Sequence, residues 1–581
     1  MVEPGRVKQV TGRRLTAHAP GTGTMVMAAM IVVLGFFLIY PVILILINSF
    51  NVSPEAFTRP REWGLDNWTQ GLAQPRLLAA VGNSIMIWGL TFGISMPFAV
   101  AIAWTLARAR MPFSHSLELL FWVSYLIPGL ATTIGWIGLL DPRIGLVNDL
   151  IARLPFVDQG PFNIFSVAGI VWVHLMGNGI ATKVILLTPA FRNMDASMEE
   201  AARIAGASNL RTALRVTIPL MISPIVLVSA LQLLRIFQSF ETELLLGTPI
   251  NFFVHSTLIY ELTRQEPPLY GQATVLGSMT LLLVAAIIPI QRWVIHRRAY
   301  TTISATFRPG LIDLGRWKYT VFGLIASLLF VLTLAPMLML VLGSFMVRSG
   351  YFEFDPPFTL LHWQSVLSSS AFVGALATTL VLATVSALLS PLLFSTIAYV
   401  LVRTRWRGRA VVDLIIWGSG TVPGIIAGLG LLWLFLGTPA LNFLFGTIWA
   451  LILVVILQGN TTGVNLFKGV SVQIGQEMED AARIAGASWV GAYFRIWIPL
   501  IMPTLVLVGM LNFATAAGTS SSIILLASRE TMTLSLLAIQ FRLADFAQEA
   551  ASVLAIVLMV LTVGVALPMR ALGLRRSVQH R

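Results

Sequence analysis

Residues 201–208 read AARIAGAS, and residues 481–488 read AARIAGAS again, 280 positions later in the chain. Two acids precede each copy, and a proline follows each copy at the same distance. Both copies interrupt very apolar sequence with polar and small residues. Chance similarity of two hydrophobic halves does not account for an identical string at the same place in each. The chain is therefore predicted to contain two tandem copies of one structural unit.

The composition is that of a membrane protein. Of 581 residues, 56% are hydrophobic and only 11% are charged, whereas a soluble domain has about 25% charged residues. Repeated apolar stretches of about 20 residues then predict transmembrane helices rather than a buried core. We expect twelve spans in two sets of six, which makes the chain an all-α integral membrane protein. Cysteine is absent, so disulfides, thiolate metal ligands and cysteine nucleophiles are excluded.

The predicted organisation is symmetric about a basic linker. Residues 25–296 are predicted to form the first six-helix unit, and residues 319–572 the second. Residues 297–318 are the linker, and residues 1–24 and 573–581 are the terminal tails. The N-terminal tail leads into a span too long for the core of a signal peptide, so the first helix is predicted to be uncleaved.

The duplication extends beyond the repeated stretch. Pro128-Gly129 recurs as Pro423-Gly424 at an offset of 295, and the offset falls to 280 from AARIAGAS onward. The missing residues fall in the loop after the third span, which is long in the first half and short in the second. Matched prolines in halves of equal span number indicate parallel repeats, related by an axis along the membrane normal.

The basic residues predict the orientation. The formal net charge is +13, and the arginines lie in short loops on one side of the predicted spans and in the tails. This placement favours a membrane surface over nucleic acid as the partner of the basic residues, so no nucleic acid is expected. By the positive-inside rule, both termini and both AARIAGAS copies are predicted to be cytoplasmic.

The repeated stretch itself is predicted to be a helix–turn–helix. The acids fall in the first turn of a short helix, where the helix dipole favours them. Small residues give that helix a smooth face onto which another surface can close, and Gly206 permits a bend. An alternative is a pair of interfacial helices that only anchor the loop at the headgroups. Anchoring alone would not require the same small residues in both halves.

Glu-Glu-Ala-Ala-x-x-x-Gly-Ala-Ser, followed by Val216-x-Ile218-Pro219, resembles the EAA loop of permease subunits of bacterial ATP-binding-cassette (ABC) importers. The resemblance covers nearly the whole chain, because the motif follows the fourth span of both six-span units. The fused two-unit arrangement resembles the ferric iron permease family, and residues 240–249, FETELLLGTP, are also similar to members of that group. The resemblance implies the MetI-like fold of type I ABC importers.

The resemblance also implies a role for the repeated stretch. In that family the loop forms coupling helices that seat in a groove of the ATPase subunits, where an acid and a glycine make the contact. Those residues are Glu200 and Gly206 in the first copy, and Asp480 and Gly486 in the second, where Asp replaces the usual Glu and puts the salt bridge in doubt. The full predicted coupling set is Glu199, Glu200, Ala201, Ala202, Gly206, Glu479, Asp480, Ala481, Ala482 and Gly486.

The chain contains no G-x-x-x-x-G-K-[ST] phosphate loop, so it is predicted not to hydrolyse ATP and not to be an enzyme. The resemblance implies two copies of a cytoplasmic ABC ATPase that bind ATP-Mg. It also implies an extracytoplasmic substrate-binding protein, which would meet residues 251–272 and 528–549, and a location in the bacterial inner (plasma) membrane. The chain itself is predicted to bind no cofactor, and its histidines show no metal-ligand spacing.

Polar residues inside spans are costly and often functional. The fifth span and its repeat partner, the eleventh, are the richest in them and are predicted to face each other across a central pathway. At the offset of 280, Gln232 corresponds to Asn512 and Glu241 to Ser521. The alternative is a structural ion pair between Arg235 and one of the glutamates. The pathway candidates are Gln232, Arg235, Gln238, Glu241, Asn512, Thr515 and Ser521.

The predicted function is that of the permease subunit of an ATP-driven, binding-protein-dependent importer that works by alternating access. The resemblance favours ferric iron as substrate, with polyamine, thiamine or aminoethylphosphonate as alternatives. A rival class is an ion-coupled secondary transporter, which would typically show inverted repeats and broken helices within each half. An intramembrane enzyme is a further rival, but no paired aspartates, HExxH or Ser/His arrangement occurs at membrane depth.

Overall fold

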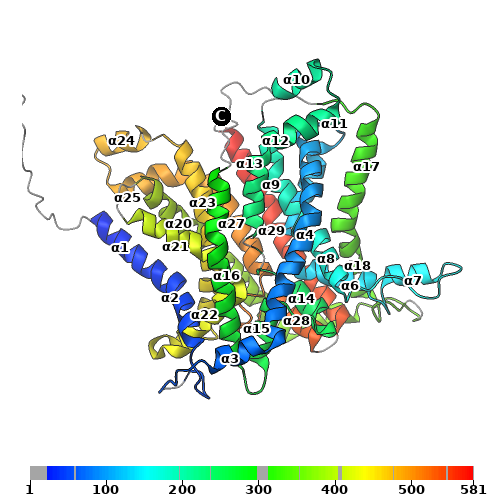
Figure 1. The fold of residues 1–581 in the computed structure, drawn as a ribbon, viewed down its shortest axis with the longest axis horizontal. Coiled ribbons are helices and arrows are strands. Elements are labelled where there is room, and N and C mark those ends of the chain that lie inside the picture. The colour runs from blue at the N-terminus through cyan, green and yellow to red at the C-terminus, as the bar shows by residue number, and fades with distance from the viewer. Residues whose placement is uncertain are drawn as a thin grey trace, which may run out of the picture.

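A computed structural model of the chain shows a molecule built of helices that run between two opposite ends (Figure 1). The predicted N-terminal tail, and most of the predicted linker between the halves, lie outside the residues that it describes. The described residues are 22–57, 60–194, 197–233, 235, 237–297, 312–351, 354–403, 408–475, 477–544 and 547–579.

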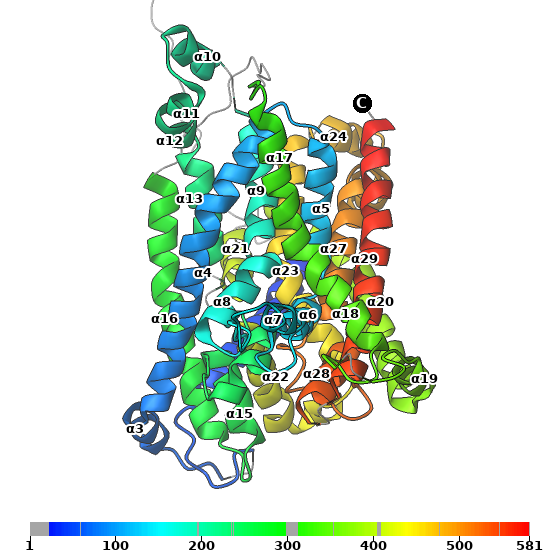
Figure 2. The same cartoon turned by 90° about the vertical axis from the view of Figure 1, so that its right-hand side faces the viewer.

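The predicted all-α membrane fold is confirmed. Among the described residues, eight helices are long and apolar enough to cross a membrane, and four bent helix pairs pass the same test together. If each bent pair is one span, the chain has up to twelve spans. Long helices packed side by side fill the middle of the molecule, and short helices lie at its two ends (Figure 2).

The first half supplies the predicted six spans. They are α1–η1–α2, α4, the bent pair α5 and α6, α8–η2–α9, the bent pair η3–α12 and α13, and α16. The bounds are α1 (Thr22–Leu34), η1 (Gly35–Ile39), α2 (Tyr40–Asn48), α3 (Asp66–Ala73), α4 (Pro75–Arg108), α5 (Ser114–Leu126), α6 (Gly129–Leu140), α7 (Leu146–Ala152), α8 (Val167–His174), η2 (Leu175–Gly179), α9 (Ile180–Arg192), α10 (Ser197–Ile204), α11 (Asn209–Thr212), η3 (Ala213–Thr217), α12 (Ile218–Leu220), α13 (Ile222–Leu233), α14 (Glu241–Leu246), η4 (Thr248–Ile250), α15 (His255–Arg264) and α16 (Tyr270–Arg297).

The second half repeats this order. Its last helix, α29, continues through most of the stretch that the sequence predicted to be a C-terminal tail. The bounds are α17 (Trp317–Leu329), η5 (Phe330–Leu334), α18 (Ala335–Phe345), α19 (Leu361–Ser368), α20 (Ser370–Arg403), α21 (Arg409–Ser419), α22 (Gly424–Gly437), η6 (Pro439–Leu444), α23 (Ile448–Gln473), α24 (Glu477–Ile484), α25 (Trp489–Ala492), η7 (Tyr493–Trp497), α26 (Ile498–Leu500), α27 (Met502–Gly518), α28 (Leu534–Leu543) and α29 (Gln548–Gln579).

The repeat is parallel and extends to single hydrogen bonds. Trp68 Nε1 donates to Ser49 Oγ at 3.0 Å, and Trp363 Nε1 donates to Ser344 Oγ at 3.1 Å. The two pairs are related by the offset of 295 that the sequence predicted. Because the same contact ties a short helix (α3 or α19) to the end of the first span in each half, the two units share fold and direction.

The matched prolines break the third span of each half. Pro128 and Pro423 adopt extended backbone angles and directly precede α6 and α22. The helices on either side meet at 96° in the first half and 113° in the second. A proline disfavours helical geometry at the residue before it and removes one backbone donor. The same sequence feature that revealed the repeat therefore also redirects the chain inside the membrane.

The fifth span is not the continuous helix over residues 219–247 that its apolar sequence predicted. Helix α13 ends at Leu233, and the chain resumes helical structure as the short α14. Its counterpart α27 continues to Gly518. Irregular backbone at membrane depth is tolerated only where protein covers it or a cavity lies beside it. In this break Phe237 and Phe240 are buried, whereas Arg235 and Gln238 are exposed.

The two halves exchange their first spans. Helix α18 of the second half packs on α6 of the first, and α2 of the first half packs on α22 of the second. A hydrogen bond of 3.0 Å from Trp433 Nε1 to Thr274 Oγ1 also joins α22 to α16. Each bent third span is therefore held by a helix from the opposite half, so the halves form one joint core.

Candidate functional site

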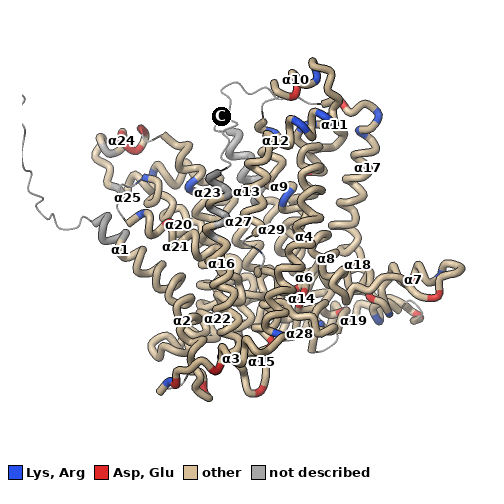
Figure 3. The backbone as a smooth tube through the Cα atoms, in the orientation of Figure 1, with Lys and Arg blue, Asp and Glu red and all other residues tan. Residues whose placement is uncertain are grey.

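The two AARIAGAS copies lie in short helices at the same end of the molecule. Helices α10 and α24 lie at the same end of the molecule in both views, and α10 projects beyond the long spans (Figures 1 and 2). Many of the Lys and Arg residues of the described chain gather at this end, while the middle band is nearly free of charge (Figure 3). We call this the coupling end.

Each short helix is followed by a glycine in the left-handed backbone region. Gly206 and Gly486 both have φ of +85°, a conformation that side chains with a Cβ disfavour. The Gly206 N–H donates to Arg203 O at 2.9 Å, and the Ala207 N–H donates to Ala202 O at 3.0 Å. This is a Schellman C-cap. The predicted bend at the glycine is thus a defined helix terminus.

The outward face of these helices carries apolar side chains, some of them large and some small. Ile204 and Ile484 are each 89% exposed, and Met198 and Met478 are about half exposed. Ala201 and Ala481 are also exposed beside them. The same residue types are therefore presented to solvent in both halves. Matched exposed apolar patches on a chain are typical of a surface that another protein covers.

The two acids that open each helix point in different directions. Glu200 and Asp480 are exposed, whereas Glu199 is fully buried and Glu479 is 5% exposed. The sequence placed all four in one coupling set. The structure leaves only the second acid of each pair on the outward face, and it uses the first acid inside the protein.

Glu199 is held by a buried network at the end of α4. Its carboxylate forms an ion pair with the Arg108 guanidinium, and Thr217 Oγ1 donates to Glu199 Oε1 at 2.6 Å. Arg108 Nη1 also donates to Met194 O at 3.1 Å, just after α9 ends. Arg108 and Glu199 are each at most 1% exposed. One arginine thus joins α4, the end of the fourth span and α10.

The second half contains the corresponding network. Arg403 Nε lies 3.3 Å from Glu479 Oε1, and Arg403 Nη2 donates to Ile474 O at 2.5 Å. The Tyr399 hydroxyl donates to Glu479 Oε2 at 2.8 Å, and the Arg403 guanidinium lies over the Trp497 ring. Arginine, glutamate and carbonyl correspond to those of the first half at the offsets of 295 and 280. Sequence reasoning missed both arginines, although their position at the ends of the second and eighth spans was visible.

The pathway candidates separate into two groups. Gln232 and Asn512 each have a hydrogen bond within their own half. Trp88 Nε1 donates to the backbone carbonyl of Gln232 at 2.8 Å, and the Asn512 side-chain amide donates to Val508 O at 2.9 Å. Both side chains are less than 10% exposed. By contrast, three of the other candidates are exposed: Arg235, Gln238 and Thr515.

Glu241 and Ser521 do meet across the two halves. The Glu241 carboxylate lies beside the backbone amides of Ser520 and Ser521, and both Glu241 and Ser521 keep partial exposure. A Cβ built on Gly424 would lie 2.7 Å from Ser521 Oγ, so α22 approaches the same point. Among the candidates, this is the pair that the structure brings together at the junction of the halves.

The ion pair that the sequence offered as an alternative does not form with Arg235. Glu243 instead accepts a hydrogen bond from the ring of His174 (2.7 Å from Nε2) and another from Ser239 Oγ at 2.6 Å. Glu243 is fully buried, while His174 is 23% exposed. From the sequence, this histidine was noted only as one of those without metal-ligand spacing. Its position in an apolar span was the one signal for its role.

The predicted outer loops are folded rather than free. Residues 251–272 contain α15 and residues 528–549 contain α28, both at the end opposite the coupling end (Figure 1). Most of the apolar residues of these short helices are buried. Charged side chains remain exposed beside them, such as Glu266 and Arg529. A partner that meets these segments would contact turns and helix ends.

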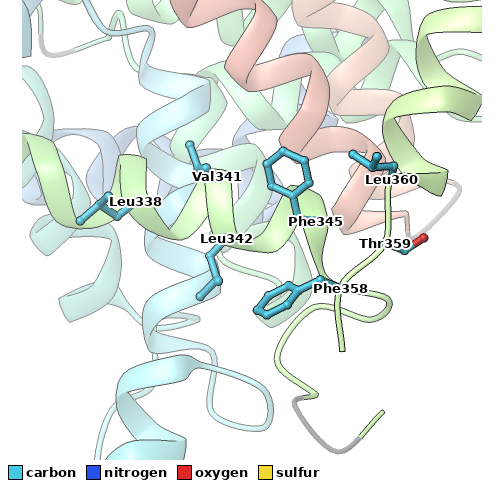
Figure 4. A pocket seen from close by; sticks show the side chains of 7 residues that line it. All are labelled: Leu338, Val341, Leu342, Phe345, Phe358, Thr359 and Leu360. Atoms are coloured by element: carbon cyan, nitrogen blue, oxygen red, sulfur yellow. The ribbon is translucent and has the colours of Figure 1, made fainter. Parts of the chain in front are cut away.

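One apolar cavity is separate from the pathway candidates. It has a volume of about 830 Å³ and lies beside α18 of the second half (Figure 4). None of the pathway candidates lines it, and its walls carry no charged side chain. The lining residues are Leu338, Val341, Leu342, Phe345, Phe358, Thr359 and Leu360.

Up to twelve spans in two parallel, interlocked repeats, each with an exposed helix after its fourth span, define a two-unit membrane permease of the ABC importer type. Residues 391–577 match the family described as "Binding-protein-dependent transport system inner membrane component". The match lies within the second half of the chain, and the first half repeats the elements of the second.

The chain is similar over most of its length to permeases of ferric transport systems. The ferric transport system permease protein FbpB of Actinobacillus pleuropneumoniae is 24% identical over 522 residues, which are 87% of this chain and 71% of the relative. A Haemophilus influenzae relative with the name FbpB 1 is 24% identical over 520 residues, covering 86% of this chain and 77% of the relative. The crystal structure of a bacterial alginate ABC transporter is 18% identical, with a TM-score of 0.41, over 48% of this chain and 95% of that one.

Proposed function

We propose that the chain is the complete membrane-spanning part of an ATP-driven importer and that α10 and α24 each dock one ATPase subunit. The observation that carries this is the pair of identical exposed helix faces at one end of the molecule. Two equivalent docking helices suit two copies of one ATPase. On this proposal the coupling end is cytoplasmic, and ATP-Mg binds in the partner subunits.

The absence of cysteine allows a direct test of orientation and docking. A single Met198→Cys or Met478→Cys substitution places a reactive thiol on each outward face. We expect both thiols to react with a membrane-impermeant maleimide only from the cytoplasmic side, and bound ATPase to protect them. Labelling from the outer side, or no protection when the ATPase encoded beside the permease is added, would refute the docking role.

The substrate that the similarity favours is ferric iron. The two ferric permeases resemble this chain over most of its length at 24% identity. In a proteoliposome assay with the binding protein encoded beside the permease, we expect ATP-dependent uptake of iron(III). Uptake of a polyamine, thiamine or aminoethylphosphonate instead of iron would move the substrate assignment without changing the transporter class.

The pathway is proposed to pass the junction of Glu241 and Ser521. These two residues belong to opposite halves. Helix α14, which begins at Glu241, lies away from the coupling end and contacts α28 (Figure 1). Helices α15 and α28 frame that end, so a loaded binding protein is proposed to dock there. Alternating access then requires that the halves part at this junction while the coupling end closes.

The broken helices keep an ion-coupled transporter as the rival class, because four spans bend sharply and broken spans are common in such transporters. The parallel repeat and the twin exposed helices favour the ATP-driven class. Uptake that persists without ATP and collapses with the ion gradient would identify the rival.

A further inference from the structure

Both halves bury one acid of the repeated stretch under an arginine from the second span of the same half. In the first half, Arg108 at the last turn of α4 meets Glu199 in α10. In the second, Arg403 at the last turn of α20 meets Glu479 in α24. Each arginine also binds the carbonyl that follows the fourth span, Met194 or Ile474. We call each set of contacts a latch.

Both latches supply a hydroxyl donor to the buried carboxylate, but the donor comes from a different position in each half. Each buried carboxylate receives a hydroxyl donor, but Thr217 in η3 supplies it in the first half and Tyr399 in α20 supplies it in the second. At the offsets of 280 and 295, Thr217 corresponds to Trp497 and Tyr399 to Trp104. The two halves thus carry one tryptophan and one hydroxyl residue at these positions, in opposite order. Such an exchange is unexpected for incidental packing.

Burial makes the latch a rigid connection. A buried carboxylate that loses its arginine is left as an uncompensated charge, so separation of the two is strongly unfavourable. The outward face of α10 and α24 is therefore fixed to the ends of α4 and α20. Helix α4 runs from the coupling end to the opposite end of the molecule (Figure 2), and α20 has the same length of 34 residues.

We propose that Arg108 with Glu199, and Arg403 with Glu479, are positioning residues that transmit ATPase motion from the docking helices to the second span of each half. The acid beside them, Glu200 or Asp480, makes the docking contact, and the buried acid makes the mechanical one. This role of the latches rests on the proposed function, in which ATPase subunits dock on α10 and α24.

The test is the amount of substrate imported per ATP hydrolysed by the reconstituted full complex. Glu199→Gln and Glu479→Gln keep the shape of the side chain and leave the outward face intact. We expect the ATPase to co-purify as with the wild type, while uptake per ATP falls by about tenfold, a change typical of a lost coupling interaction. The matched control is Glu118→Gln, which removes the ion pair with Arg192 at the same end without touching α10. We expect it to transport normally.

The exchanged hydroxyls provide a rescue that simple structural support would not predict. Thr217→Val removes the hydroxyl donor of the first latch and is expected to lower uptake per ATP several-fold. Adding Trp104→Tyr supplies a hydroxyl from the second span, as Tyr399 does in the other half, and is expected to restore most of the loss. Arg108→Lys, which keeps the charge but cannot serve both acceptors equally well, should fall between wild type and Glu199→Gln.

Three outcomes decide the matter. Normal uptake per ATP in the Glu199→Gln, Glu479→Gln double variant would overturn the latch, and so would loss of ATPase binding in that variant, which would make the buried acids docking residues. If no ATPase binds the wild-type chain, the proposed function itself fails, and that result is distinct from both.

Discussion

Gly135 of α6 lies against Pro336 of α18 so closely that a Cβ on the glycine would be 2.8 Å from the proline Cβ. The same relationship recurs with the halves exchanged, because a Cβ on Gly430 would lie 2.9 Å from the Cβ of Pro41. Both glycines sit in the bent third spans, and both prolines sit in the first span of the opposite half. This pair of contacts is where the two repeats interlock.

Filling this contact should loosen the joint core. In Gly135→Ala the new methyl group overlaps backbone atoms of the opposite half, so we expect a loss of about 1–3 kcal/mol in stability, and a similar loss for Gly430→Ala. The measurement is the thermal unfolding midpoint of the purified protein in detergent. Gly93→Ala in α4 is the control, because nothing lies within 4 Å of the added Cβ. Equal midpoints for Gly135→Ala and Gly93→Ala would show that the halves move apart freely.

The repeated glycines are predicted to matter for backbone conformation rather than for space. Nothing lies within 4 Å of a Cβ on Gly206 or Gly486, but their φ of +85° strains other residues by about 1–2 kcal/mol. We expect Gly206→Asn to retain more uptake than Gly206→Val, because asparagine tolerates this conformation. The double Gly206→Val, Gly486→Val variant should insert normally and lose coupling. If uptake in the Gly206 variants falls with side-chain volume and does not depend on tolerance of positive φ, the role of backbone conformation is contradicted.

The sequence predicted the spans, the repeat and the coupling helices because these depend on local patterns. Apolar length, matched prolines and one repeated octapeptide are readable without tertiary contacts. The latches were not predicted, because Arg108 and Glu199 are 91 residues apart in the sequence. In addition, an arginine at the end of a span was interpreted only as an indication of which end is cytoplasmic. The break after Leu233 was missed for a related reason. In this break Phe237 and Phe240 are buried while Arg235 and Gln238 are exposed, and hydropathy alone does not reveal that arrangement.

The exposed acids Glu200 and Asp480 are predicted to make the same charged contact with the ATPase, although the Asp480 side chain is one methylene shorter. Asp480→Glu lengthens the second acid to match Glu200, so we expect ATPase binding to be retained or tightened. Glu200→Lys together with Asp480→Lys reverses the charge on both outward faces. We expect that variant to bind the ATPase at least about tenfold more weakly, or about 1.4 kcal/mol. Titration of the purified permease with ATPase measures both effects, and unchanged affinity in the lysine variant would remove these acids from the docking contact.

The His174–Glu243 contact is predicted to be structural. Glu243→Gln removes the charge that strengthens the hydrogen bonds to His174 and Ser239, at a cost of about 2 kcal/mol in stability. The matched control is Glu261→Gln, which removes a partly exposed ion pair with Arg76 and should cost less than about 1 kcal/mol. Thermal unfolding distinguishes the two variants. If Glu243→Gln is as stable as the control but transports poorly, Glu243 belongs to the pathway instead.

Glu241 is predicted to act where the two halves separate. Its carboxylate lies beside the backbone amides of Ser520 and Ser521, so the contact depends on the Glu241 charge and on backbone N–H groups rather than on the serine hydroxyls. Glu241→Gln keeps an acceptor but loses the charge beside the two amides. We expect uptake to fall by about tenfold, which corresponds to about 1.4 kcal/mol. Ser521→Pro removes one N–H and should impair uptake more than Ser521→Ala, which keeps it.

The measurement that decides the role of Glu241 is the maximal uptake rate at saturating loaded binding protein, with the thermal unfolding midpoint measured in parallel. A pathway residue changes the rate at an unchanged midpoint, whereas a residue that only packs lowers both together. Should Ser521→Ala impair uptake as much as Ser521→Pro, the hydroxyl and not the backbone would be the group that faces Glu241.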